Sequence, residues 1–206
     1  MNPLAPRTRL PGRPPVARQP IWTADGRLYA HELLYRSADG LAVGVDLWDP
    51  PDQDLATASV LEALDDEPDE RGVLSFVNVT RSYVVGRHRL PRPDDGLVLE
   101  IVETVPADDE VLAGLQRLRE LGYRIALDDF AAEAHQVAML PYAHYVKIDC
   151  RELVQHGTAL VELARRDGAM LVAERLSSSA LVDRCVSLGF DLLQGDALGP
   201  ATTARS

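Results

Sequence analysis

The sequence predicts an α/β fold of the (β/α)8-barrel type, formed by one domain. Short apolar segments alternate with amphipathic segments of about 10–15 residues, which is typical of parallel strand–helix–strand units. Charged and amide side chains recur where the apolar segments end, and in a barrel these ends open on one face. The 206 residues, 46% of them hydrophobic, suffice for one domain, although this length is small for a barrel.

The N-terminal sequence predicts a tail followed by a β-hairpin. Residues 1–15 contain charges and prolines but no apolar signal segment, so we expect a flexible tail. The segments PVARQPIW and RLYAHELLYR flank the turn sequence ADG, in which Gly26 can adopt a positive φ. We assign the barrel to residues 16–200 and a C-terminal tail to residues 201–206.

The rest of the chain continues the alternation. The expected helices are residues 55–66, 108–122, 151–168 and 177–189. The expected strand segments are residues 73–79, 96–103, 123–130, 144–149, 169–174 and 190–195. Because the chain is short for a barrel, we expect somewhat reduced outer helices, particularly between Arg36 and Val73.

Polar residues close the predicted strands one after another. They are Glu32, Asn78, Glu100, Glu103, Asp128, Asp129, Lys147, Asp149, Glu174 and Gln194. Successive strand residues point to opposite faces, so Asp128 and Asp129 cannot both lie passively on one solvated face. A ring of carboxylates would repel itself without cations. Carboxylate and amide oxygens suit Mg²⁺ or Mn²⁺, and one shared carboxylate can bridge two such ions for phosphate ester cleavage.

Each of these residues, taken alone, also has a structural interpretation. An aspartate at the end of a strand can cap the next helix. Lys147 or Asp149 can belong to a surface ion pair, Gln194 can belong to a turn, and Glu103 and Asp149 can hold loops. The recurrence of acids and amides at strand end after strand end favours a common site over separate structural roles.

Charge and cysteine usage restrict the partners and the location. The chain has 21 basic and 32 acidic residues, a formal net charge of −11, so we expect no DNA or RNA polymer as a partner. An anionic ligand would need metal ions or a few placed cations. No apolar run approaches the ~20 residues that span a bilayer, so we expect no membrane insertion. Cys150 and Cys185 lack a zinc-ligand spacing, which favours free thiols in a reducing cytoplasm.

Taken in order, the strand-end motifs resemble the EAL domain of bacterial cyclic-di-GMP phosphodiesterases. RLYAHELLYR resembles the opening strand of that family, with ELL in place of EAL, and FVNVT resembles its Asn-bearing strand. LEIVE, ALDDF, VKID, VAE and LGFDLLQG follow in the family's order with similar spacing, and the match covers about residues 16–200. ARQPI, ELLYR and FVNVT are most similar to the EAL module that is joined to an HDOD domain in some signalling proteins.

The resemblance implies a TIM barrel of the EAL kind with an antiparallel first strand. It also implies two Mg²⁺ or Mn²⁺ ions and hydrolysis of cyclic di-GMP to linear pGpG in bacterial second-messenger signalling. The implied metal ligands are Glu32, Asn78, Glu100, Asp128, which would bridge the two ions, and Asp129. The implied catalytic residues are Lys147, which would contact the attacking water, Glu174 and Gln194. Gln19 and Arg36 match family positions that contact the dinucleotide.

Departures from the family pattern leave three functions open. Ala131 follows DDF where the family has Gly, and Arg175 and Ser177 replace the Gly and Glu of the family's EGVE motif. Asp196 and Ala197 follow QG where the family tends to have aromatic residues. The complete ligand set favours an active phosphodiesterase. The alternatives are a cyclic-di-GMP sensor with poor turnover and a protein-interaction module, and the preferred metal, a homodimer and a protein partner stay open as well.

Overall fold

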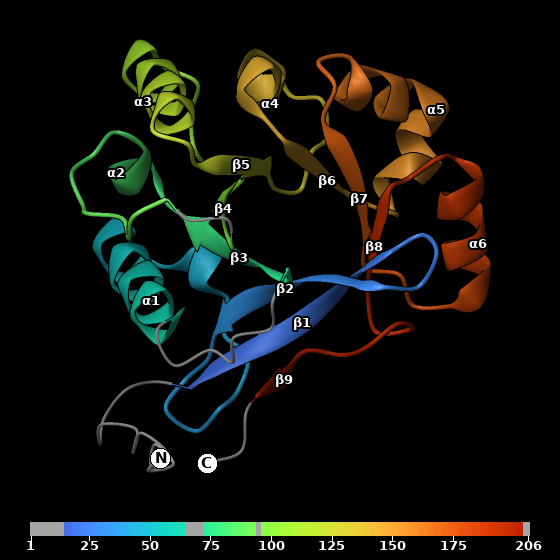
Figure 1. Ribbon diagram of the computed structural model, residues 1–206, viewed down its shortest axis with the longest axis horizontal. Coiled ribbons are helices and arrows are strands. Elements are labelled where there is room, and N and C mark those ends of the chain that lie inside the picture. Colours follow the sequence, from blue (N-terminus) through green and yellow to red (C-terminus); the bar gives the residue numbers. More distant parts are fainter. Residues whose placement is uncertain (1–14, 65–71, 94–95, 204–206) are drawn as a thin grey trace, which may run out of the picture.

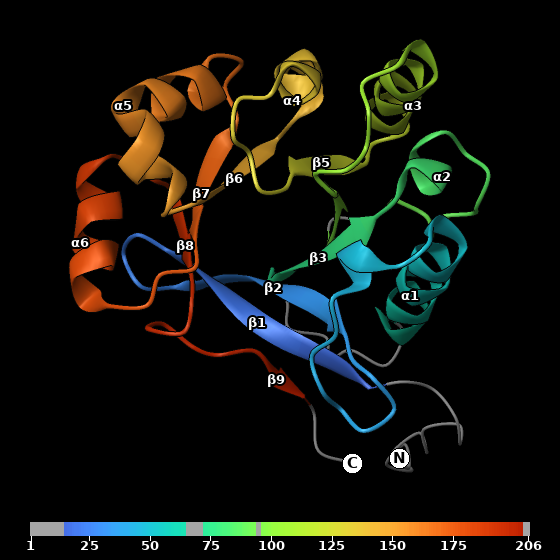
Figure 2. The same ribbon diagram turned by 180° about the vertical axis from the view of Figure 1, so that it is seen from behind.

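The computed structural model describes residues 15–64, 72–93 and 96–203, and within them eight strands close into a barrel (Figures 1 and 2). The ring runs in the order β2-β3-β4-β5-β6-β7-β8-β1, and β1 pairs with β2 to close it. The strands are β1 (Val16–Thr23), β2 (Leu28–Tyr35), β3 (Leu74–Val79), β4 (Leu97–Ile101), β5 (Arg124–Leu127), β6 (Tyr145–Asp149), β7 (Met170–Glu174) and β8 (Leu192–Gln194). The barrel predicted from the sequence is confirmed, while its predicted N-terminal tail lies, apart from residue 15, outside the described residues.

Strand β1 is antiparallel to both of its neighbours, whereas the other neighbouring strands of the ring are parallel. The turn before β2 contains Gly26 at φ 82°, as expected for a tight hairpin. Gln19 of β1 is paired with Glu32, and Ile21 is paired with Gln194. The reversed first strand therefore brings Gln19 to the carboxyl ends of the parallel strands.

A short strand, β9 (Thr202–Thr203), lies outside the ring and pairs antiparallel with β1. Thr203 is paired with Ala17, and Thr202 with Arg18. This strand falls in the segment 201–206 that the sequence analysis assigned to a tail. Figures 1 and 2 show β1 and β9 on the side of the barrel that none of the described helices covers. Pairing with β9 satisfies part of the backbone that β1 exposes there.

Six α-helices surround the described part of the ring on its other sides (Figures 1 and 2). They are α1 (Pro50–Ala63), α2 (Arg81–Val84), α3 (Asp109–Glu120), α4 (Ala134–Met139), α5 (Glu152–Arg165) and α6 (Ser179–Ser187). The four longer helices coincide with predicted helices. The reduced helices are α2 and α4, with 4 and 6 residues, and not the segment between Arg36 and Val73, where α1 has 14 residues. The expected place of the reduction was wrong because α1 starts at Pro50, a residue suited to a first helical turn.

The apolar core has two layers, one inside the barrel and one between the strands and the helices. The inner layer consists of Ile21, Ala30, Leu74, Phe76, Val98, Ala126, Tyr145, Val172 and Leu192. Phe76 and Tyr145 lie edge to face in it, with ring centroids 5.1 Å apart. The barrel interior is therefore filled by side chains and is not a channel.

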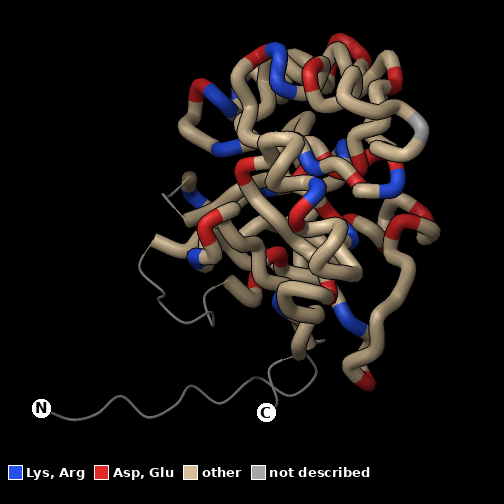
Figure 3. Tube along the Cα trace, turned by 90° about the vertical axis from the view of Figure 1, so that its right-hand side faces the viewer, with Lys and Arg blue, Asp and Glu red and all other residues tan. Residues whose placement is uncertain are grey.

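Acidic and basic residues are interspersed along the chain (Figure 3). Among the described residues, no helix combines the length and the apolar character that crossing a membrane requires.

Candidate active site

Strand alternation carries the polar residues into the mouth of the barrel. Phe76 of the inner apolar layer is followed two positions later by Asn78, and Val98 is followed by Glu100. Side chains two positions apart share a face, so these polar groups lie directly above the apolar layer. The same spacing links Ala30 to Glu32, Ala126 to Asp128, Tyr145 to Lys147, Val172 to Glu174 and Leu192 to Gln194. On the antiparallel β1, the order is reversed and Gln19 precedes Ile21.

Lys147 lies at the centre of this group and is almost completely buried, with 1% of its surface exposed. Its Nζ lies 2.8 Å from Glu174 Oε1 and 3.3 Å from Asp128 Oδ1. It also lies 3.3 Å from Glu32 Oε2 and donates a hydrogen bond to Glu100 Oε1. One ammonium group thus meets carboxylates from four different strands or strand ends. This placement shows that the residue is not the surface ion-pair partner that the structural interpretation of Lys147 envisaged.

Glu32 is held by amides on both sides. Asn78 Nδ2 donates to Glu32 Oε1 over 3.2 Å, and Gln194 Nε2 donates to Glu32 Oε2 over 2.6 Å. The amide of Gln194 also lies 3.3 Å from Gln19 Oε1. Gln194 is therefore not a simple turn residue, because its side chain is buried and connects β1, β2 and β8.

Several buried oxygens at the site have no hydrogen-bond partner among the described residues. They are Asn78 Oδ1, Glu100 Oε2 and Gln194 Oε1. A buried acceptor without a partner is costly, and such a group commonly binds an ion or an ordered water. In addition, one carboxylate oxygen from each of Asp128, Asp129 and Glu174 lies within 4.8 Å of the other two. These oxygen donors fit a hard divalent cation.

The carboxyl groups are strongly perturbed by burial and by one another. Burial, followed by the repulsion of Glu32, raises the pKa of Glu100 well above its usual value. Burial also raises the pKa of Glu174 to about 8, although Lys147 opposes the shift. The pKa of Asp129 is raised by burial and by neighbouring Asp128. Burial alone would lower the pKa of Lys147, but the surrounding carboxylates together keep that pKa well above its usual value. One ammonium group does not balance this set of acids.

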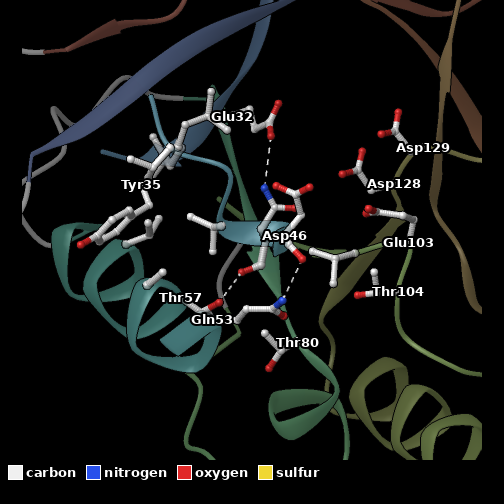
Figure 4. Close-up of a pocket in the computed structure, with 18 of the residues that line it drawn as sticks. Glu32, Tyr35, Asp46, Gln53, Thr57, Thr80, Glu103, Thr104, Asp128 and Asp129 are labelled. Carbon is white, nitrogen blue, oxygen red and sulfur yellow. Dashed lines mark hydrogen bonds between the residues drawn. The ribbon is translucent and has the colours of Figure 1, made fainter. Parts of the chain in front are cut away.

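A cavity of about 310 Å³ opens beside the acidic group, between the strand ends and α1. Figure 4 shows Glu32, Asp128 and Asp129 at one end of it and Thr57 of α1 toward the other. Arg36 lines the same cavity, and its Nη1 donates to the backbone oxygen of Tyr35 over 3.1 Å. Gln19 lines a second cavity, and Glu32 lines both cavities. Both residues expected to contact a dinucleotide are therefore next to the acidic group.

Two strand-end acids of the sequence pattern lie away from the Lys147 cluster. Asp149 accepts hydrogen bonds from Arg151, at 2.8 Å from Nε, and lies 2.9 Å from Arg175 Nε. Glu103 lines the cavity, and its backbone oxygen is 2.9 Å from His135 Nε2. The arginine contacts of Asp149 agree with its alternative role of holding a loop.

Side-chain hydrogen bonds hold the loop after Phe130 in place. Gln136 of α4 accepts a hydrogen bond from the backbone N–H of Ala131 over 2.9 Å and donates one to the backbone oxygen of Asp129 over 3.0 Å. Glu133 and Gln136 also form a reciprocal capping box at the start of α4. The side chain of Gln136 therefore fixes the backbone beside the two aspartates.

Other residues of the cavity were not singled out by the sequence. Thr57 donates to the backbone oxygen of Asn78 over 3.0 Å, and Gln53 donates to that of Asp46 over 3.1 Å (Figure 4). A polar residue on the apolar face of a predicted helix was a usable signal for Thr57, which is buried. No periodic signal marked Asp46, which lies in a 3-10 turn (Val45–Leu47).

Comparison with known proteins identifies the family to which a barrel with this arrangement of acids belongs. The sequence pattern of the EAL domain matches residues 75–201, and the chain belongs to the EAL domain family. The uncharacterized protein YuxH of Bacillus subtilis is 30% identical over 187 residues, which are 87% of this chain and 45% of YuxH. The cyclic di-GMP phosphodiesterase CdgJ of Vibrio cholerae is 29% identical over 187 residues, 87% of this chain and 42% of CdgJ. The chain thus spans less than half of the length of these relatives.

Solved structures share the fold at lower identity. The PaMucR phosphodiesterase in complex with c-di-GMP superposes with a TM-score of 0.76 at 23% identity, covering 93% of this chain and 98% of that one. The EAL-domain protein YkuI of Bacillus subtilis, in complex with c-di-GMP and calcium, gives 0.77 at 18% identity, covering 93% and 56%. BlrP1 of Klebsiella pneumoniae, in a calcium and cy-diGMP complex, gives 0.75 at 22%, covering 98% and 59%. These likenesses confirm the EAL-type barrel.

Proposed function

We propose that this chain is a metal-dependent phosphodiesterase domain that hydrolyses cyclic di-GMP to linear pGpG. The observation that carries the proposal is the group of Asp128, Asp129 and Glu174, whose ligand oxygens lie within 4.8 Å of one another beside Lys147. A relative at 29% identity is named as a cyclic di-GMP phosphodiesterase, and it supports this substrate. Two cations, Mg²⁺ or Mn²⁺, would offset the excess of acidic groups and give an anionic ligand its positive site.

The proposed ligands follow from donor chemistry and position. Glu32, Asn78, Glu100 and Asp128 would hold one cation, and Asp128 would share the second with Asp129. The unpartnered Asn78 Oδ1 and Glu100 Oε2 support this assignment, since they are buried acceptors without a donor among the described residues. Bound divalent cations at a phosphoryl group supply Lewis-acid stabilisation of its developing charge.

The remaining residues would orient the reacting groups. Lys147 would fix the carboxylates and offset negative charge at the attacked phosphate, because its ammonium is buried and cannot exchange these partners for water. Glu174 would add a carboxylate on the Asp129 side. Gln194 would keep Glu32 in place. Gln19 and Arg36, in the two cavities that Glu32 also lines, would contact the dinucleotide.

A sensor with poor turnover is the second candidate, and one contact favours it. Arg175 Nη2 lies 3.6 Å from Asp129 Oδ2, so an ion pair engages a proposed ligand. A protein-interaction module without ligand is the third candidate.

We further propose that the EAL barrel spans residues 16–200 and works in the cytoplasm. Its two buried free cysteines support that location.

Calorimetric titration separates these functions. Cyclic di-GMP is added to the purified chain once with Ca²⁺ and once with EDTA, and a reaction with Mg²⁺ or Mn²⁺ is then analysed by chromatography. We expect binding that requires the cation, together with pGpG formation. Binding without product would support the sensor instead. No heat in either titration and no product would contradict both nucleotide functions and leave the interaction module.

A further inference from the structure

Arg175, the residue that follows β7, connects two acids at the mouth of the barrel. Its Nε lies 2.9 Å from Asp149 Oδ2, and its Nη2 lies 3.6 Å from Asp129 Oδ2. The side chain of Arg175 is 58% exposed, and that of Asp129 is 36% exposed. Arg175 thus places a partly exposed positive charge beside Asp129, whereas the ammonium of Lys147 is buried.

The backbone around Arg175 holds this position. Arg175 has φ 54°, in the left-handed region that residues other than glycine rarely adopt. Its backbone oxygen accepts a hydrogen bond from Cys150 Sγ over 3.6 Å, and the next residue, Leu176, donates its N–H to the oxygen of Gln194 over 3.1 Å. Leu176 is completely buried. Contacts from Cys150, which follows β6, and from β8 therefore fix the chain on both sides of the arginine.

The two contacts of Arg175 differ in strength. Asp149 is also bound by Arg151, whose Nε lies 2.8 Å from Asp149 Oδ2, so this acid is a fixed anchor. The contact to Asp129 is longer and partly exposed, and exposed ion pairs are weak. Asp129 can therefore exchange Arg175 for another cation while Arg175 stays attached to Asp149.

We propose that Arg175 is a positioning residue that occupies Asp129 in the absence of metal and weakens the binding of a divalent cation there. The inference rests on the proposed function, in which Asp129 belongs to the cation site. A guanidinium beside a ligand oxygen repels an incoming cation, and the ion pair must open before Asp129 can coordinate. Arg175 thereby raises the cation concentration at which the Asp129 side of the site fills, and its ion pairs among the described residues are with Asp129 and Asp149.

The test measures binding of Mn²⁺ alone, without nucleotide, by electron paramagnetic resonance of the free ion. Arg175→Gln removes the charge, and Arg175→Lys retains it. Arg151→Gln is the matched control, because Arg151 shares Asp149 but makes no ion pair with Asp129 among those found in the described residues. Arg175→Gly is a second neutral variant that suits the left-handed backbone. Thermal unfolding verifies that each variant is folded.

Of the two proposed ions, the Mn²⁺ at the Asp129 side of the site is the one expected to bind more weakly. We expect Arg175→Gln and Arg175→Gly to bind this ion about three- to tenfold more tightly than the unsubstituted chain. Arg175→Lys and Arg151→Gln are expected to stay within about twofold, and added salt should reduce the difference. The inference would be overturned if the unsubstituted chain and both neutral variants bound Mn²⁺ with equal affinity. The proposed site would stay intact in that case if Asp129→Asn still weakened Mn²⁺ binding. No Mn²⁺ binding by any of these proteins would overturn the site and the inference together.

Discussion

The side chain of Gln194, on the last strand of the ring, donates a hydrogen bond of 2.6 Å to Glu32 Oε2 on the second strand. The two residues are 162 positions apart in the sequence, and β1 lies between their strands. Gln19 of β1 is paired with Glu32 and lies 3.3 Å from the same Gln194 amide. The same strand pairing that closes the barrel at β1 therefore also orients the Glu32 side chain.

Replacing Gln194 tests whether this bond serves the site. Gln194→Met removes the donor and keeps a similar volume. We expect hydrolysis of cyclic di-GMP to fall about 10–100-fold, the usual effect of losing a group that orients a metal ligand. The free energy of unfolding should change by less than about 1.5 kcal/mol, because the unpartnered Gln194 Oε1 is removed at the same time. Gln116→Met, at the exposed glutamine of α3, is the control, and equal activity of the two variants would refute the role of Gln194.

Lys147 should be essential for stability when no metal is bound. Lys147→Met leaves the buried Glu100 without its cation, and breaking a buried ion pair from one side typically costs about 3–5 kcal/mol. Urea unfolding in EDTA measures this loss. The double variant Lys147→Met with Glu100→Gln should recover part of it, since the two residues interact directly. Strictly additive effects of the two substitutions would show that the contact is not energetically coupled.

Gly195 should be far less tolerant of a side chain than Gly189. A Cβ at Gly195 would overlap the backbone nitrogen and oxygen of Leu176, and the residue has φ 153°. Gly189 has φ 80° but open space around an added Cβ. We expect Gly189→Ala to cost about 1 kcal/mol and Gly195→Ala at least about 2 kcal/mol of unfolding free energy. Equal costs in chemical denaturation would mean that the loop after β8 can move away from Leu176.

His144 gives the fold a pH dependence that is independent of the acidic site. Its Nδ1 accepts the backbone N–H of Ile125 over 3.0 Å, which requires the unprotonated nitrogen. Burial, with help from Arg119 and Arg124, lowers the pKa of His144. Because the folded-state pKa is lowered, the stability that neutral His144 contributes is fully present above its unfolded-state pKa of about 6.5. This contribution is lost as the pH falls from there toward the lower folded-state pKa.

The measurement compares urea unfolding of the unsubstituted chain and His144→Asn at two pH values. We expect the substitution to cost about 1 kcal/mol near pH 7.5, the usual net value of one hydrogen bond, and less near pH 5. Other titrating groups cancel in this comparison, because both proteins contain them. A cost that grows toward acidic pH would contradict the assignment.

The polar group at the barrel mouth could be predicted because strand periodicity is simple. Glu100 and Asn78 follow inner apolar residues by two positions, so strand ends that share one face are visible in the sequence. The hairpin before β2 was equally visible, since Gly26 marks the turn. These features depend on local patterns that the folded barrel preserves.

Other features depend on contacts that no local pattern encodes. Helices α2 and α4 have 4 and 6 residues, too few for a helical period to appear. The contact of Arg175 with Asp129 arises from a left-handed backbone and from neighbours in β8 and just after β6. The central position of Lys147 among carboxylates of several strands likewise emerges only when the ring closes.

The most direct test of the central claim is chromatography of cyclic di-GMP incubated with Mn²⁺ and either the unsubstituted chain or Asp128→Asn. Asp128 is the proposed shared ligand and contacts Lys147 at 3.3 Å. Asp183→Asn, at an exposed acid of α6, is the matched control. The account predicts pGpG from the unsubstituted chain and the control, and a loss of at least about 100-fold in Asp128→Asn. Equal product from Asp128→Asn and the unsubstituted chain, or none from the latter, would contradict it.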